Sequence, residues 1–308
     1  MATDLTTAVM ARAPSVVTNR HASWYTTAAD YWALTKPEVN FLILLTTFVS
    51  FHLASVPGAA RILTLIHALV GTLLVASGAA ALNQFIERFF DAKMRRTARR
   101  PLAAGRLSPL NVLWFGIALS VAGALYLAAL NRLTAVLAVL TLLGYLLLYT
   151  PLKRKTPLCT LVGAFPGAVP PLIGWAAARG RLDPEAWALY LIVFLWQFPH
   201  FMAIAWMYRD DYSRAGYHVL PAQASRDRFV TWQSYGCSLA LVPVALIPSF
   251  AGQSGDIYSV GAFLLSLGFL YFSKRFAFQR SNITARQLLV SSVLYLPLLF
   301  TLLVLDKK

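Results

Sequence analysis

The chain has 308 residues, 58% of them apolar and only 13% charged, and its mean hydropathy is +0.62. This composition excludes an ordinary soluble domain and indicates an integral membrane protein. The sequence lacks the short segments of alternating hydrophobicity that a transmembrane β-barrel requires, so we expect an all-α polytopic protein. The net charge of +15 is carried between the apolar runs, which indicates membrane topology and anion binding and argues against a nucleic-acid partner.

The N-terminal 35 residues contain no apolar core of a secretory signal, so we expect residues 1–35 to form a disordered or interfacial tail. A short element at 24–32 would suit the membrane surface. Residues 36–308 are expected to form a single transmembrane domain, because nine apolar runs approach the ~20 residues that cross a bilayer as a helix. The predicted spans are 39–57, 62–86, 109–130, 133–150, 158–178, 186–207, 229–250, 257–273 and 287–305.

The fifth predicted span is interrupted by Pro166, Pro170 and Pro171. Proline breaks helical hydrogen bonds, and backbone freed in this way is tolerated at membrane depth only inside protein or beside a cavity. The sequence therefore predicts either a helix that bends around a central binding chamber or a kink that packs against small neighbours.

The connections between the spans differ in charge. Of the 27 Lys and Arg residues, few fall in the connections that share a side with the C-terminus. Those few are Arg61, Arg132, Arg179, Arg181, Lys307 and Lys308. The positive-inside rule then places the N-terminus in the cytoplasm and the C-terminus outside. We therefore expect a multi-pass membrane protein with a central chamber that opens to the cytoplasm. The expected location is a bacterial inner membrane, and the sequence leaves a mitochondrial inner membrane open as the alternative.

A cluster of polar residues marks the cytoplasmic end of the second span. Asn83, Glu87 and Asp91 recur every four residues, so a helix would carry them along one face, about 6 Å apart. Basic residues follow at Lys93, Arg95, Arg96, Arg99, Arg100 and Arg106. Carboxylates that hold a hard cation, beside cations that hold an anion, suit a metal–diphosphate site. The alternative is a basic loop that only sets the membrane topology and whose acids pair with its arginines. This alternative explains poorly why Asn83 and Glu87 lie inside the apolar end of the span.

A second cluster closes the sixth span. Asp210 and Asp211 are neighbours that point about 100° apart on a helix, so we expect only Asp211 to face inward. His200 lies roughly two turns earlier, at membrane depth. It either packs through a hydrogen bond or contacts a ring-shaped substrate.

A third cluster is the short turn between the fourth and fifth spans, where Lys153, Arg154 and Lys155 follow Tyr149. Three cations in a rigid turn would close over a phosphate. The same residues would also serve as a simple topology signal, and the sequence leaves both interpretations open.

Together these clusters indicate one reaction class. Two carboxylate groups across a cavity can bridge Mg²⁺ to a diphosphate, and Arg and Lys can take the charge that develops as diphosphate leaves. Apolar and aromatic walls suit an isoprenoid tail and stabilise a carbocation. The sequence thus predicts prenyl transfer by ionisation of an allylic diphosphate. A secondary transporter is the alternative from a different class.

Several motifs carry a resemblance to a known family. The stretch 83–102 is similar to the first signature of the intramembrane UbiA-type prenyltransferases. Four further stretches resemble the protohaem IX farnesyltransferase (haem O synthase) branch: 149–157, 170–175, 196–201 and 211–221. The resemblance implies transfer of a farnesyl group from farnesyl diphosphate to a vinyl group of haem B, and it makes haem A synthase a possible partner that takes the product. A related enzyme acting on a quinone precursor or a chlorophyll-type acceptor stays open as the alternative.

The resemblance also implies roles for individual residues. The expected Mg²⁺ ligands and catalytic residues are Asn83, Glu87 and Asp91 on one side and Asp211 on the other. The expected diphosphate-binding residues are Arg96, Arg100, Lys153 and Arg154. Tyr149 is a further expected substrate-binding residue, and His200 is the candidate for contact with haem. The chain departs from the family pattern at Glu87, where Asp is usual, and at Ala215, where the wider superfamily completes a second D-x3-D motif. These departures leave open whether one or two Mg²⁺ ions bind.

Overall fold

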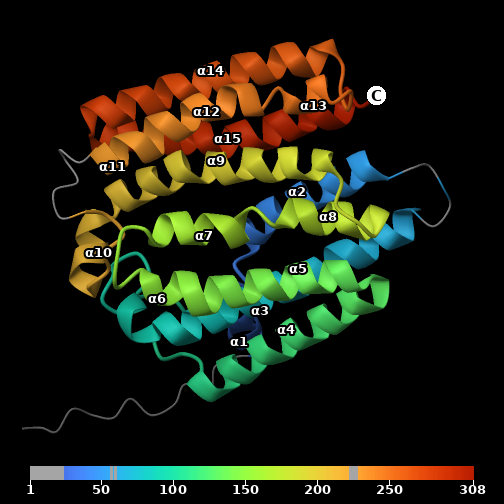
Figure 1. The fold of residues 1–308 in the computed structure, drawn as a ribbon. Helices are drawn as coiled ribbons and strands as arrows, with labels where there is room; N and C mark the ends of the chain where they lie inside the picture. The colour runs from blue at the N-terminus through green and yellow to red at the C-terminus, as the bar shows by residue number, and fades with distance from the viewer. Residues whose placement is uncertain (1–23, 56–57, 59–60, 222–227) are drawn as a thin grey trace, which may run out of the picture.

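A computed structural model describes residues 24–55, 58, 61–221 and 228–308, and nearly all of them are helical (Figure 1). Within these ranges nine helical segments are long and apolar enough to cross a membrane, which confirms the nine predicted spans. Single helices form most of them: α2 (Pro37–Ala54), α3 (Arg61–Asp91), α4 (Pro109–Leu130), α9 (Pro184–Met207), α14 (Asp256–Gln279) and α15 (Asn282–Leu305).

The remaining spans are composite. The fourth consists of α5 (Arg132–Leu143), a π-helical stretch η1 (Gly144–Tyr149) and α6 (Thr150–Leu152). The fifth is divided into α7 (Cys159–Gly167) and α8 (Pro170–Arg179). The seventh consists of α11 (Arg228–Thr231), η2 (Trp232–Gly236), α12 (Cys237–Val244) and α13 (Ile247–Phe250). Wider π turns often occur at functional sites, and η1 ends directly beside one of the predicted clusters.

Helix α3 runs on to Asp91, past the predicted end of its span at residue 86. Hydropathy marks where apolar character ends, but Glu and Arg are good helix formers and continue the backbone hydrogen bonds beyond that point. The polar residues at 83, 87 and 91 therefore share one unbroken helix, as their spacing predicted.

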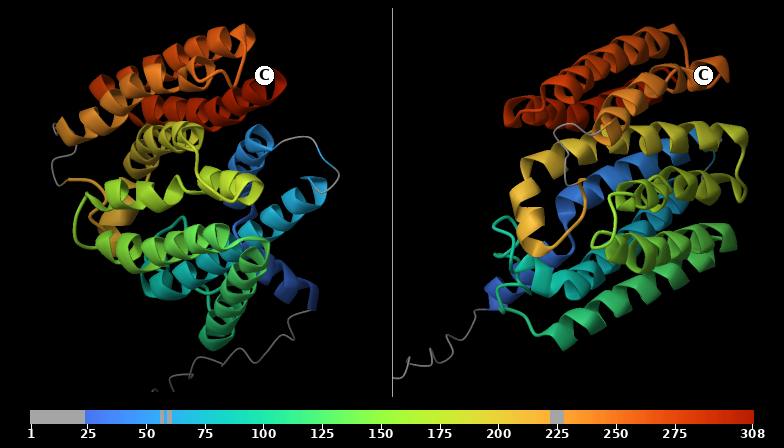
Figure 2. Two further views of the ribbon diagram at one scale, coloured as in Figure 1. Left: turned by 45° about the vertical axis from the view of Figure 1, so that its right-hand side comes forward. Right: turned by 60° about the vertical axis from the view of Figure 1, so that its left-hand side comes forward.

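The spans pack in chain order, and the last one returns to the first. Each span contacts its successor, and α15 contacts both α9 and α2. Figures 1 and 2 show the resulting layers, with α12, α14 and α15 on one side of α9 and with α3, α4 and α5 on the other. The arrangement encloses an interior that several helices share.

The break in the fifth span places α8 in that interior. Helix α7 packs between η1 and α9, whereas α8 contacts α2, α3, α5 and α9, and its residues 170–177 are all buried. Gly174 permits this close approach, because a Cβ at that position would collide with the backbone oxygen of Thr47. The predicted interruption is confirmed, and its consequence is a short helix that fills the middle of one half of the bundle.

The C-terminus closes the bundle at the end that carries α8. Lys307 Nζ donates to the backbone oxygens of His52 (2.6 Å) and Ser55 (3.3 Å) at the end of α2. Arg179 Nε donates to the backbone oxygen of Ala54. A polar cavity of about 390 Å³ lies here, lined in part by Trp175, Arg179 and Lys307. The Arg179 and Lys307 side chains that line this cavity donate hydrogen bonds to backbone carbonyls, so they stabilise the fold.

A further helix, α1 (Trp24–Leu34), forms where a short surface element was expected. It packs against α3 and α4: Leu34 is fully buried, Tyr31 contacts the ring of Phe115, and Gln84 Nε2 donates to the backbone oxygen of Leu34 over 2.9 Å. Most of the predicted tail, residues 1–23, lies outside the described residues.

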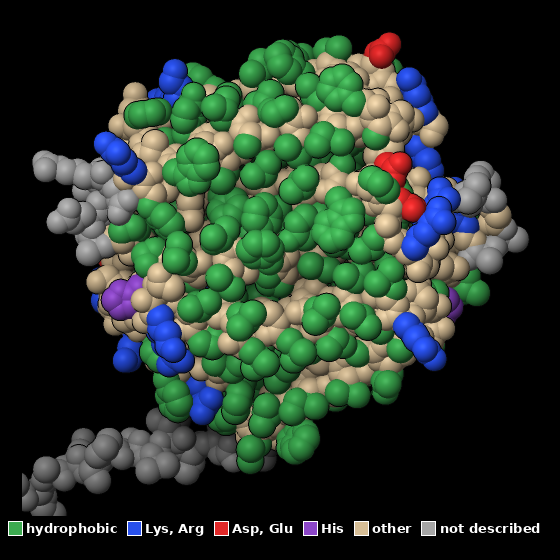
Figure 3. Space-filling view, viewed as in Figure 1, with side chains coloured by type: hydrophobic (Ala, Val, Ile, Leu, Met, Phe, Trp, Pro, Cys, Tyr) green, Lys and Arg blue, Asp and Glu red, His purple; other side chains and the backbone are tan. Residues whose placement is uncertain are grey.

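The surface agrees with a membrane location. Figure 3 shows an apolar face across the middle of the molecule, with Lys and Arg gathered towards its two ends. Large apolar side chains such as Trp114, Leu125 and Phe278 are each about two-thirds exposed, which is unfavourable in water and favourable in lipid. The protein is therefore a multi-pass membrane protein.

Candidate active site

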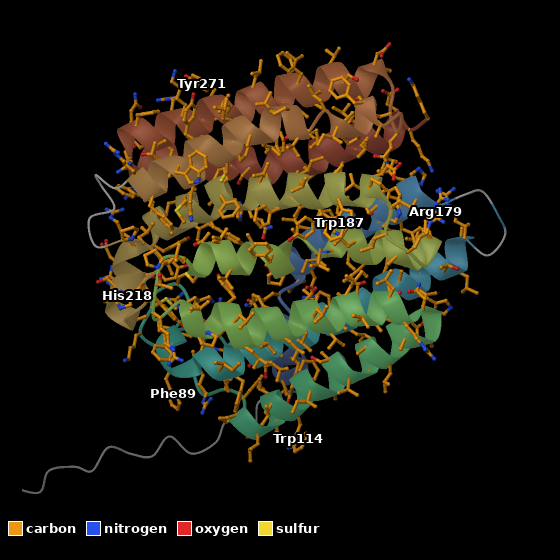
Figure 4. The ribbon with its side chains drawn as sticks, in the orientation of Figure 1. Phe89, Trp114, Arg179, Trp187, His218 and Tyr271 are labelled. Carbon is orange, nitrogen blue, oxygen red and sulfur yellow. The ribbon has the colours of Figure 1, made fainter. Side chains whose placement is uncertain are left out.

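Three polar residues line one face of the last turns of α3. Asn83, Glu87 and Asp91 are all at least 95% buried, although each lies near the end of the span. Phe89, between them in sequence, is 65% exposed and lies on the outer side of the bundle (Figure 4). The four-residue spacing thus turns the polar groups inward and the apolar residues outward, as the sequence predicted.

Glu87 is paired with Lys153, the residue that follows α6. Lys153 Nζ lies 2.9 Å and 3.2 Å from the two carboxylate oxygens and 4.5 Å from the centre of the Tyr149 ring. Burial lowers the pKa of Lys153, but Tyr149 and the Glu87 carboxylate outweigh burial and hold that pKa well above its ordinary value. Lys153 therefore stays a cation, and the structure brings the first and third predicted clusters together.

Asp91 is paired with Arg100 from the loop that follows α3. Arg100 Nη1 lies 2.7 Å from Asp91 Oδ2, and Thr97 Oγ1 donates to the backbone oxygen of Asp91 over 2.8 Å. The second carboxylate oxygen, Oδ1, is buried and has no hydrogen-bond partner among the described residues. A buried carboxylate oxygen without a donor is costly, so this atom is available to a cation.

Asn83 is held by two neighbours that sequence reasoning did not assign to the site. Lys36 Nζ donates to Asn83 Oδ1 over 3.1 Å, and Asn83 Nδ2 donates to Thr150 Oγ1 over 3.2 Å. Thr150 is placed by η1, because its hydroxyl donates to the backbone oxygen of Tyr145, five residues earlier. The Asn83 amide therefore joins α2, α3 and the fourth span.

Lys36 enters the site through an unusual backbone conformation. Its φ of 53° lies in the left-handed region, which residues other than glycine rarely adopt. Burial, together with the neighbouring cations Arg100 and Lys153, lowers the pKa of Lys36 to about 7, although Glu87 and Asp91 act in the opposite direction. A Lys-Pro pair at the start of the first span was the available signal, but the lysine was interpreted only as a topology residue.

Asp211 completes the charged group from α10 (Arg209–Ala215). Its carboxylate forms an ion pair with Arg214 and accepts a hydrogen bond from the backbone N–H of Arg96 over 3.2 Å. Asp211 is buried, whereas the side chain of Asp210 is 82% exposed, so the inward orientation expected for Asp211 is observed. The second predicted cluster therefore meets the loop that follows the first.

The remaining predicted diphosphate ligands lie at the exposed rim. The guanidinium of Arg96 lies 5.0 Å from the centre of the Tyr208 ring, and that of Arg154 lies 5.0 Å from the centre of the Phe90 ring. Tyr217, which sequence reasoning did not single out, lies under this rim beside Phe90, and its hydroxyl is buried. Burial raises the pKa of Tyr217, and the nearby Glu87 raises it further.

His200 is not brought into this charged group. Its Nδ1 lies 2.8 Å from Ser292 Oγ on α15, and its ring contacts those of Trp196 and Phe201. The structure therefore places His200 beside α15, deeper in the bundle than the carboxylates.

Cations outnumber carboxylates in the charged group, and each carboxylate already has a basic partner. Consequently, the described residues contain no group of three or more His, Cys, Asp or Glu side chains poised around one metal position. The carboxylates of α3 are spaced along the helix, and cations lie between them. This arrangement favours a site that binds an anion and a metal cation together. Figure 4 shows this end of the bundle, near His218, opposite Arg179 at the other end.

Comparisons with known proteins identify the family of the chain. Residues 43–300 match the profile of the UbiA prenyltransferase family. A protein of Solibacter usitatus named protoheme IX farnesyltransferase is 49% identical over 90% of this chain and 98% of its own. A protein of the same name from Salinibacter ruber is 43% identical over 90% of this chain and 98% of its own.

Solved structures show the same fold at low sequence identity. A digeranylgeranylglyceryl phosphate synthase superimposes with a TM-score of 0.74 at 14% identity, over 91% of this chain and 98% of its own. A UbiA homologue from Archaeoglobus fulgidus bound to GPP and Mg²⁺ superimposes with a TM-score of 0.63 at 16% identity, over 89% and 99%. The chain therefore belongs to the UbiA prenyltransferase family, together with its relatives named protoheme IX farnesyltransferase.

Proposed function

We propose that this protein transfers the farnesyl group of farnesyl diphosphate to a vinyl group of haem B, which yields haem O and diphosphate. The observation that carries the proposal is the charged group at the end of α3, where three buried carboxylates meet more cations than they can neutralise. The choice of haem as acceptor is supported by relatives named protoheme IX farnesyltransferase, which match the chain over nearly their whole length.

The residues present fit a divalent cation. Asp91 Oδ1 is buried without a donor, and the neighbouring groups on the same face, Asn83 and Glu87, offer the oxygen ligands that Mg²⁺ prefers. Asp211 would approach from α10. When bound, Mg²⁺ would neutralise the diphosphate oxygens and make the diphosphate a better leaving group. One uncommitted carboxylate oxygen and the absence of a second D-x3-D motif favour a single ion.

Substrate binding would exchange the ion pairs within the site. Lys153 and Arg100 now neutralise Glu87 and Asp91. An incoming diphosphate offers these two cations a partner with more than one negative charge and frees the carboxylates for the metal. Lys36 Nζ is hydrogen-bonded to Asn83 and would be a further donor to the diphosphate. Arg96 and Arg154 would bind the diphosphate from the exposed rim of the site. Cations held in place stabilise the charge that develops on the leaving oxygen.

The bond between the farnesyl C1 and the diphosphate oxygen breaks, and the diphosphate keeps the electron pair. The resulting allylic cation is attacked by the terminal carbon of the haem vinyl group, which forms the new C–C bond. The positive charge that remains on the other vinyl carbon is captured by water, which loses a proton and leaves the hydroxyl of haem O. Tyr149 and Tyr145, whose rings lie 5.4 Å apart beside Lys153, are suited to stabilise the allylic cation.

We further infer that the charged end faces the cytoplasm of a bacterial inner membrane, since basic residues gather there. Lys36 and Lys307 lie at opposite ends of the bundle, so this orientation places the C-terminus outside. Haem A synthase would be a partner that takes the product.

The decisive experiment combines purified protein in detergent with Mg²⁺, farnesyl diphosphate and haem B, with products read by mass spectrometry. We expect haem to gain a hydroxyethylfarnesyl group, and we expect an Asp91→Asn variant to lose this activity. Unmodified haem together with prenylation of 4-hydroxybenzoate would refute haem as the acceptor. Failure of the folded protein to prenylate any ring acceptor would refute the prenyl-transfer proposal itself.

A further inference from the structure

Basic side chains gather at the end of the bundle opposite the charged site, the end at which Figure 4 labels Arg179. The positive-inside rule makes Lys and Arg rare in the connections on this side, and the sequence places only six there. Four of the six line the polar cavity of about 390 Å³, and a fifth, Arg61, is hydrogen-bonded to the His52 ring beside it. The four that line the cavity are Arg179, Arg181, Lys307 and Lys308. Such a concentration of disfavoured residues around one cavity calls for a use.

The cavity has walls that are fixed to one another. They come from the ends of α2 and α8, the start of α9, the connection between α13 and α14, and the residues that follow α15. The backbone N–H of Lys308 donates to the backbone oxygen of Gln253 over 3.1 Å, and Lys307 Nζ donates to two backbone oxygens at the end of α2. These bonds hold the last two lysines at defined positions in the wall.

The carboxylates of the lining do not neutralise its cations. Asp183 is already occupied, because Arg181 Nε lies 2.8 Å from its Oδ1 and Trp175 Nε1 donates to its Oδ2 over 3.0 Å. Three cations of the lining then face one remaining carboxylate, that of Glu185. These cations are Arg179, Lys307 and Lys308. The cavity therefore favours an anion.

The same cations keep donors that the fold does not use. The bond to the backbone oxygen of Ala54 uses only Nε of Arg179, which leaves the Nη groups of the guanidinium. Lys307 has three N–H donors and two carbonyl acceptors. Burial lowers the pKa of Lys307, and the nearby Arg61 and Arg179 lower it further, so a bound anion would relieve repulsion between these cations.

Exposed apolar side chains lie next to the cavity in the chain. Phe250 is 83% exposed and comes two residues before Gly252 of the lining, and Leu305 is 77% exposed and comes two residues before Lys307. Cations at the end of a span, with apolar side chains just inside them, match the boundary between lipid headgroups and hydrocarbon. This arrangement suits a ligand that has both a phosphate group and acyl chains.

We propose that this cavity binds the phosphate group of an anionic phospholipid from the leaflet at this end of the bundle, with Arg179, Lys307 and Lys308 as the donors. Inorganic phosphate has the same anionic chemistry, but it would leave Phe250 and Leu305 without a role. The site is distinct from the carboxylates of α3, so its failure would leave the proposed prenyl transfer intact.

The test is a titration of the full-length protein in detergent with phosphatidylglycerol or with phosphatidylcholine, which has no net charge. Native mass spectrometry reports the bound lipid, and thermal unfolding reports the stabilisation. Wild-type protein should retain phosphatidylglycerol in preference to phosphatidylcholine and melt at a higher temperature with it. Each charge of a Lys or Arg near the lipid contributes about fivefold to the affinity, so Lys308→Gln should weaken phosphatidylglycerol binding about fivefold and Lys308→Glu about 25-fold.

Lys308 is the residue to vary, because its side chain has no hydrogen bond or ion pair within the described ranges, and its variants should melt like wild type without lipid. Arg132→Gln and Arg132→Glu are the matched controls, because Arg132 is an exposed cation on the same side that does not line the cavity. Equal binding of the two lipids by wild type, or equal losses in the Arg132 and Lys308 variants, would overturn the proposal. Stabilisation by inorganic phosphate that equals that by phosphatidylglycerol would overturn the lipid as the ligand.

Discussion

The ion pair between Glu87 and Lys153 provides a quantitative test of the site. We expect Lys153→Met to destabilise the protein, because it leaves a carboxylate that is 95% buried without its partner. Breaking a buried pair from one side costs about 3–5 kcal/mol. Lys36 also attracts Glu87, so the lower end, ~3 kcal/mol, applies. That loss corresponds to a fall in melting temperature of at least about 5 °C.

The assay is thermal unfolding in detergent, reported by a thiol-reactive dye that labels the buried Cys159 and Cys237 as they become exposed. Lys155→Met is the matched control, since Lys155 is an exposed lysine of the same turn. The double variant Glu87→Gln/Lys153→Met should recover part of the loss, because no buried charge remains. If Lys153→Met melts at the same temperature as Lys155→Met, the pair is not a buried one and the reasoning fails.

Three further predictions follow. Asp91→Asn, or removal of divalent cations by EDTA, should reduce prenyl transfer by at least about 100-fold while leaving the melting temperature within a few degrees, as product formation and dye labelling would show. Gly174→Ala should destabilise the protein by about 1–3 kcal/mol, because the new Cβ would collide with α2. Gly268→Ala is the control and should be neutral or slightly stabilising, because a Cβ there meets nothing within 4 Å. A reversed order of melting temperatures would contradict the close packing of α8. The hydrogen bond from Trp175 lowers the pKa of Asp183, so this carboxylate stabilises the fold above its unfolded pKa, and the stabilisation should be lost as pH falls through the lower folded value; acid unfolding of Asp183→Asn should lack that component.

The spans and the acidic face were predictable because each depends on local pattern. Apolar length alone located the nine spans of the described residues, and the spacing of Asn83, Glu87 and Asp91 placed these three residues together on α3. The orientation of Asp211 followed from the 100° turn between neighbours. The ends of several helices differ from the predicted ends of the spans, as for α3 and α14, because hydropathy does not report where helical hydrogen bonding stops.

The contacts between distant segments were not predictable in the same way. Lys36 reaches Asn83 only because α2 begins beside the end of α3 in the folded bundle. The location of α8 depends on packing at Gly174, and the proline pattern alone fitted a bend or a simple kink equally well. His200 was recognised as unusual, but its partner Ser292 lies 92 residues away on another helix, and no local pattern connects them.

The closure of the bundle by α15 has a consequence for how the protein is made. The chain emerges from the ribosome N-terminus first, so α2, α3 and α9 are present before their partner α15 has been synthesised. Until α15 arrives, the backbone oxygens of His52 and Ser55 lack the lysine that holds them, and the Ser292 side chain is missing beside His200. A chain truncated before Asn282 would keep the residues of the charged site but would expose the faces of α2, α9 and α14 that pack against α15 in the complete protein.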